Sequence, residues 1–145
     1  MKFDYDDCIR EGLLRKVVPS RRKTIKSFEK GKNWLEEAKK NLSSKSLDSC
    51  VVSSHLAIFH TARAILIRDG FREKSHYCVA RYLEEKYVKQ EKLEQRWINL
   101  LDHYRDLRHS DQYDVGFYAT EQEAQSALEF AENFVKRMEK LFKEK

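Results

Sequence analysis

The stretch that decides the fold is Leu47–Asp69, which reads LDSCVVSSHLAIFHTARAILIRD. Apolar side chains occur on nearly every side of a helix drawn through it, which is typical of a helix buried at the centre of a bundle. Its most apolar part, from Cys50 to Ile67, contains Arg63 and two histidines and is short of a full bilayer span. We therefore expect a central core helix and no transmembrane helix.

Length and composition favour one all-α domain. The chain has 145 residues with 41% hydrophobic and 37% charged side chains, which is too apolar for a disordered protein. Only four glycines and one proline are present, whereas a fold of short strands needs many such turn residues. The acidic amino terminus has no apolar run behind it, so we expect a cytoplasmic protein without a secretory signal or membrane contact.

Amphipathic patterns on both sides of the central stretch predict further helices. Ser20 is expected to cap one that runs to about Ser43, and Thr120 with Glu123 forms a capping box for the last helix. The expected helical ranges are about 4–16, 20–43, 47–69, 75–87, 91–109 and from 120 onward. Short connections between such helices favour an up-and-down antiparallel bundle of four main helices plus short ones. We expect residues 1–19 to be an N-terminal helical extension and residues 20–145 to form a single bundle domain.

The cysteines and histidines give no metal or redox signal. Cys8, Cys50 and Cys78 form no CxxC pair and are odd in number, so we expect buried reduced thiols. His55 and His60 lie about 140° apart on a helix, so they do not share a face as metal ligands would. We predict neither a metal site nor a cofactor.

Positive charge is concentrated near the amino terminus. The whole chain carries a net charge of +5, and its first 45 residues hold 13 basic and 7 acidic side chains. Such a cluster could follow a phosphate backbone, or it could be an ordinary solvated helix face. The candidate phosphate-binding residues in it are Arg21, Arg22, Lys23 and Lys26.

A second arginine signal lies on the helix expected at 91–109. Arg108 falls within about 20° of Leu101 on the apolar stripe, since seven residues make about two turns. A guanidinium cannot lose its proton on burial, so it needs a carboxylate, a phosphate or a solvated cleft. Arg105, near the edge of the stripe, is a further candidate phosphate ligand. The alternative is a structural ion pair with a neighbouring helix, which we expect for Arg63 in the central helix.

Two motifs in this order resemble small prokaryotic HEPN-domain proteins, over about residues 20–140. The first is His55–Leu66 followed by Gly70 and Lys74–His76, which is similar to YYAxFHAARALL, then G and K-[ST]-H. The second is the polar segment from Arg108 to Tyr113, at the position of the family's signature motif.

The resemblance implies a helical bundle that commonly dimerises, with the signature arginines of two protomers meeting in a cleft. Many such proteins are metal-independent ribonucleases that use an arginine followed, after four to six residues, by a histidine. They are often toxins encoded beside a minimal nucleotidyltransferase. By this analogy Arg108 is the cation, but the position expected for histidine holds Tyr113, with Asp111 and His109 nearby. Tyrosine is a weak base at neutral pH, since its ordinary pKa is about 10.

Three hypotheses follow from the sequence. The first is a homodimeric ribonuclease or toxin component in which Arg108, Tyr113, Asp111 and His109 form the catalytic cleft and the basic cluster steers RNA. The second is a non-catalytic module that binds a nucleotide, or a nucleotidyltransferase antitoxin partner, through the same cleft. The third is a purely structural bundle, which would be favoured if Arg108 were enclosed with a carboxylate of its own chain.

Overall fold

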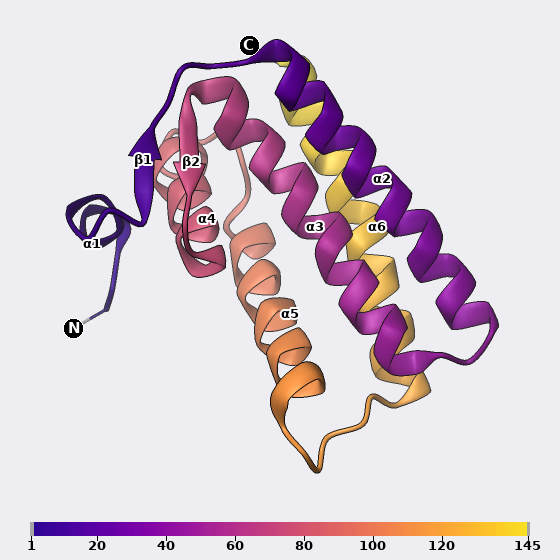
Figure 1. Ribbon diagram of the computed structural model, residues 1–145. Helices are drawn as coiled ribbons and strands as arrows, with labels where there is room; N and C mark the ends of the chain where they lie inside the picture. Colours follow the sequence, from indigo (N-terminus) through magenta and orange to yellow (C-terminus); the bar gives the residue numbers. More distant parts are fainter. Residues whose placement is uncertain (1, 145) are drawn as a thin grey trace.

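Four long helices that alternate in direction form the body of the protein. The computed structural model describes residues 2–144, and its long helices are α2 (Arg21–Ser43), α3 (Leu47–Asp69), α5 (Gln95–Tyr113) and α6 (Glu121–Lys143). Helix α3 lies in the middle and packs against the other three (Figure 1). The predicted all-α, up-and-down architecture is confirmed.

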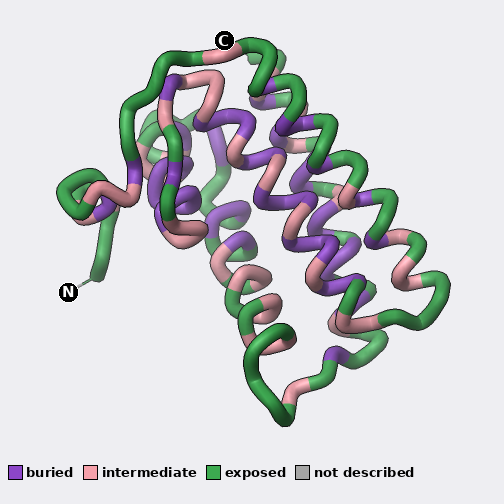
Figure 2. The backbone as a smooth tube through the Cα atoms, viewed as in Figure 1, coloured by how far each residue is buried: buried purple, intermediate pink, exposed green. Residues whose placement is uncertain are grey.

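The core runs along α3. Its side chains at Ala57, Ile58, Ile65 and Leu66 have no solvent exposure, and the inward faces of the neighbouring helices are buried with them (Figure 2). By length and composition α3 could cross a membrane, yet 72% of its most apolar window is buried inside the bundle. Its apolar character is therefore accounted for by helix packing.

The predicted helix boundaries near α2, α3 and α6 are confirmed by their caps. The Ser20 hydroxyl accepts a hydrogen bond from the Lys23 amide, and Thr120 and Glu123 form the expected capping box. Helix α3 ends at Gly70, whose φ of 85° is the left-handed conformation that glycine adopts without strain.

The amino-terminal segment differs from the prediction. Instead of one helix over residues 4–16, the structure has a short helix α1 (Tyr5–Arg10) and a strand β1 (Leu14–Lys16). Strand β1 pairs antiparallel with β2 (Phe71–Glu73), directly after α3. Gly12, with a φ of 72°, ends the helix, and the partner strand lies too far along the sequence for local periodicity to reveal it.

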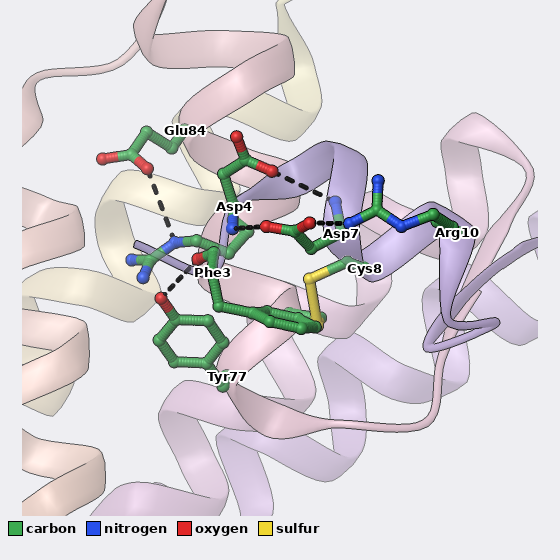
Figure 3. The surroundings of a disulfide bond; sticks show 9 residues. Phe3, Asp4, Asp7, Cys8, Arg10, Tyr77 and Glu84 are labelled. Carbon is green, nitrogen blue, oxygen red and sulfur yellow. Dashed lines mark hydrogen bonds and ion pairs between the residues drawn. A yellow bond between two sulfur atoms is a disulfide. The ribbon is translucent and has the colours of Figure 1, made fainter. Parts of the chain in front are cut away.

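A disulfide joins Cys8 of α1 to Cys78 of α4 (His76–Leu83), so the prediction of reduced thiols is wrong for these two residues. The bond links residues 70 apart in the sequence, and no short motif marks it. Beside it, the Tyr77 hydroxyl donates a hydrogen bond of 2.7 Å to the Phe3 carbonyl (Figure 3). Cys50 is a free, buried thiol, as predicted.

Helix α5 is displaced along the sequence relative to the prediction. After α4 the chain continues as a π-helical turn, η1 (Glu84–Val88), and α5 then occupies Gln95–Tyr113 instead of 91–109. The whole signature segment is therefore helical. Ile25 of α2 and Leu100 of α5 are each 38% exposed, so not every apolar side chain of these helices faces the core.

Candidate functional site

Arg108, near the end of α5, has no carboxylate within ion-pair distance among residues 2–144. One terminal nitrogen donates to Gln112 Oε1 at 2.9 Å, and the other lies 3.5 Å from His76 Nδ1. Its Nε is buried and has no hydrogen-bond partner in the described part of the chain. Burial lowers the pKa of Arg108 from its ordinary value.

Every other buried or half-buried arginine in the described part of the chain lies within 4 Å of a carboxylate. Arg63 makes a bidentate contact with the buried Glu73, at 2.5 and 3.0 Å to the same oxygen, which confirms the structural pair expected for it. Arg81 pairs with Asp102 at 2.5 Å. The remaining three, Arg68, Arg105 and Arg137, pair with acidic side chains at 3.3, 2.5 and 3.0 Å. The charge of Arg108 is the exception.

An aromatic cluster faces this guanidinium. His76, the first residue of α4, stacks on Phe59 of α3 with ring centroids 3.9 Å apart, and its Nδ1 lies 3.2 Å from Nε2 of His55. Arginine only donates hydrogen bonds, so its contact with His76 requires an unprotonated Nδ1 and places the imidazole proton on Nε2. Burial first, and the Arg108 charge second, lower the pKa of His76, so its neutral form prevails at neutral pH.

His55 is the buried residue that contacts His76 on the inner side of the site. The side chain is 4% exposed, and burial, with Arg108 adding to the effect, lowers the pKa of His55 to about 3. A permanently neutral His55 can hold the His76 ring without adding charge to the site. The Nδ1 atom of His55 is buried without a hydrogen-bond partner among the described residues.

Arg105, predicted as a phosphate ligand, is paired with a carboxylate of its own chain. Its guanidinium pairs with Asp102 at 2.5 Å and lies 5.1 Å from the centre of the Tyr77 ring. Asp102 also binds Arg81, so one carboxylate bridges two arginines and fixes α4 against α5. This arrangement is structural and leaves Arg105 less available to a ligand than Arg108.

None of the three other predicted catalytic residues forms a hydrogen bond or ion pair with Arg108 within residues 2–144, and only Tyr113 acts on its charge, by raising the pKa of Arg108 against the larger effect of burial. Asp111 points toward Asp48 at the start of α3, and burial together with that carboxylate raises the pKa of Asp111 to about 7. His109 and Tyr113 lie on the exposed side of α5 with their rings 4.9 Å apart, and Tyr113 is 63% exposed. Because α5 continues to Tyr113, that residue lies about 140° around the helix from Arg108.

The structure therefore brings Arg108 together with His76, a residue that sequence reasoning had noted only as part of the Lys74–His76 motif. The signal was present, since that motif carries part of the family resemblance. The position of His76 relative to α5 could not be predicted, because His76 and Arg108 are 32 residues apart and meet only in the folded chain.

The predicted phosphate-binding residues on α2 separate into two groups. Lys23 and Lys26 line a groove of about 490 Å³ between α2, α3 and β2. Arg21 lines a different cavity of about 670 Å³ beside Arg68, and Arg22 is exposed outside both linings. Within residues 2–144 no group of three or more His, Cys, Asp or Glu side chains is placed to hold a metal ion.

This bundle belongs to the HEPN domain family, whose match covers residues 25–141. The chain is also 30% identical over 117 residues to a protein of Methanocaldococcus jannaschii named "Putative toxin MJ0605". That similarity covers 76% of this chain and 87% of the archaeal protein.

Proposed function

We propose that this HEPN protein is a metal-independent endoribonuclease that acts as a toxin component, with Arg108 as the phosphate ligand. The observation that carries the proposal is the uncompensated, half-buried charge of Arg108 beside the neutral imidazole of His76. A buried cation without a carboxylate is costly to the fold, and an anionic ligand would relieve that cost. The similarity to a protein named as a toxin supports the same assignment.

Metal-free RNA cleavage needs a proton acceptor for the 2′-hydroxyl, a cation for the phosphorane and a donor for the leaving oxygen. In the proposed reaction Arg108 turns from His76 to the phosphate, the 2′-oxygen attacks phosphorus as its proton passes to the Nδ1 that Arg108 has released, and the bond to the 5′-oxygen breaks. The imidazolium then returns the proton to that leaving oxygen. Arg108 donates to the phosphoryl oxygens, which carry most charge in the transition state.

The surface around the end of α5 supports a homodimer as the working unit. Tyr113, Val115 and Tyr118 are 63%, 95% and 75% exposed, which is unusual for large apolar side chains placed so close together in the sequence. In the proposed dimer a second copy covers these residues and brings its own Tyr113 and His109 to the cleft. We further propose a cytoplasmic protein with a minimal nucleotidyltransferase antitoxin as partner, as the family resemblance implies.

The test is cleavage of several structured and unstructured RNAs in EDTA, at a protein concentration that supports dimers. We expect Arg108→Ala to lower the rate by about 100-fold or more, the usual effect of removing one transition-state donor. Arg96→Ala, which removes an exposed arginine of the same helix, is the matched control and should leave the rate unchanged. Undiminished cleavage by Arg108→Ala, or none by the native protein on any RNA, contradicts the proposal.

The alternative is a phosphate-binding module without catalysis, for a nucleotide or a nucleotidyltransferase. It is favoured by one observation, the exposed tyrosine at the position where the family's ribonucleases carry histidine. In that case a nucleotide or co-purified partner would raise the melting temperature of the native protein but not of Arg108→Ala, and no RNA would be cleaved.

A further inference from the structure

A basic groove lies on the side of the bundle where α2, α3 and strand β2 meet. Its volume is about 490 Å³, and Val17 and Val18 form part of one wall. Charged side chains dominate the rest of the lining. The basic ones are Lys23, Lys26, Lys30, Arg63 and Arg72, and the acidic one is Glu73.

Most of this positive charge is not balanced within the described chain. The one carboxylate of the lining, Glu73, already forms an ion pair with Arg63. The three lysines and Arg72 have no carboxylate within 4 Å in residues 2–144. On the same helix but outside the groove, Lys32 pairs with Glu139 and Lys39 with Glu36. Outside the groove two of the three α2 lysines are therefore paired and Lys40 is not, whereas in residues 2–144 none of the three lysines along the groove is paired.

The antiparallel pair of β1 and β2 adds a second sign of an anionic ligand. Arg15 of β1 stands directly opposite Arg72 of β2 in the antiparallel register, so two guanidinium groups share one face of the sheet. Like charges at directly opposed positions destabilise a strand pair. Apart from the Gly12 carbonyl, which accepts from Arg15 Nε at 3.3 Å, neither side chain has a hydrogen-bond partner in the described chain. Arg72 lines the groove and Arg15 does not, so a phosphate bound to Arg72 in the groove would offset the repulsion.

The groove is connected to the candidate site through α3. His60 lines the groove, and its ring meets the edge of Phe59 at 5.3 Å between centroids. Phe59 in turn stacks on His76, which contacts Arg108. Burial, followed in size by the Arg63 charge, lowers the pKa of His60 to about 4, so this residue can hydrogen-bond a ligand as a neutral ring.

We propose that this groove binds the phosphate backbone of single-stranded RNA and leads the strand toward His76 and Arg108. That the strand leads to His76 and Arg108 rests on the proposed function, whereas the binding of RNA in the groove does not. Lys23 and Lys30 are seven residues apart, about 10 Å along the helix axis, so the unpaired lysines can contact more than one phosphate of a strand. That extent favours a strand over a mononucleotide.

The test measures binding of a fluorescent 2′-O-methyl oligouridylate, which offers no 2′-hydroxyl for cleavage, by fluorescence anisotropy as a function of salt. The groove variant is Lys23→Ala/Lys26→Ala/Lys30→Ala. The control is Arg96→Ala/Lys136→Ala/Lys140→Ala, which removes the same charge from another basic groove of about 520 Å³ between α5 and α6. Thermal melting establishes that both variants fold.

Three lost contacts to a single strand should reduce the salt slope of log Kd by about 2 and weaken binding about 100-fold at 0.1 M salt. The control should stay within about threefold of the native protein. Equal weakening in both variants would show attraction by net charge alone and would overturn the proposal. So would unchanged binding in the groove variant, or uridine monophosphate competing as tightly per molecule as the oligonucleotide.

The outcome is separable from that of the cleavage experiment. Selective loss of binding in the groove variant supports the groove even if the native protein cleaves no RNA, and in that case only the ribonuclease assignment fails. Conversely, cleavage that depends on Arg108, with no effect of the groove variant on binding, keeps the ribonuclease and overturns the groove.

Discussion

Replacing Arg108 with methionine should make the protein more stable. The substitution keeps an unbranched stem in the apolar stripe and removes a buried Nε that has no partner. An unsatisfied buried polar group costs about 1–3 kcal/mol, while the hydrogen bond lost to the exposed Gln112 is worth about 1 kcal/mol. We expect the free energy of unfolding to rise by about 1 kcal/mol, or the melting temperature by about 3 °C.

Arg63→Met is the matched comparison, since it makes the same change at a half-buried arginine that does have a partner. It leaves the Glu73 carboxylate, 6% exposed, without its cation, which should cost about 3–5 kcal/mol. Urea unfolding at pH 7.5, followed by circular dichroism, measures both variants. If Arg108→Met instead lost more than about 1 kcal/mol, Arg108 would be a structural residue and the reasoning about the site would be refuted.

Three further predictions concern the frame around the site. Reduction of the bond between Cys8 and Cys78, which closes a loop of 70 residues, should cost about 4 kcal/mol from chain entropy; a reductant that leaves the melting temperature unchanged would count against the bond. Asp111→Asn should stabilise the protein at pH 8 but not at pH 4. Below its pKa in the unfolded chain, Asp111 is protonated in both the folded and the unfolded state. Burial and the Asp48 charge raise the pKa of Asp111 to about 7 in the folded state, so the stability of the native protein falls as the pH rises from the unfolded pKa to the folded one. Melting temperatures of the two proteins that change in parallel across this pH range would contradict the shift. Gly31→Ala should cost about 1–3 kcal/mol in urea unfolding, because the added methyl group would come within 2.5 Å of a side chain on α3; a neutral effect would show that the two helices can separate freely.

The bundle could be predicted from the sequence because its signals are local. The apolar periodicity of Leu47–Asp69, the Ser20 cap and the capping box at Thr120 each lie within a few residues. Arg108 could be singled out for the same reason, since a charged residue interrupting an apolar stripe is visible on one helix.

The remaining features are contacts between distant segments, which one sequence does not reveal. The β1–β2 pairing joins residues more than 50 apart, and the disulfide joins residues 70 apart. The end of α5 was predicted four residues too early, so the exposed, helical position of Tyr113 could not be foreseen, and its catalytic role stays a prediction. His76 joins Arg108 only through the packing of α4 against α5.

The amino-terminal segment, which lies outside the family match at residues 25–141, holds helix α4 in place at this site. His76 begins α4 and would be free to move if only its own helix held it. Two residues later Cys78 is bonded to Cys8, and three residues earlier Glu73 pairs with Leu14 in the sheet. The first 16 residues thus fix α4 on both sides of His76, at the contact with Arg108. An imidazole placed by a neighbouring helix in this way needs such bracing, because the side chain and its arginine are not held in register by a single helix.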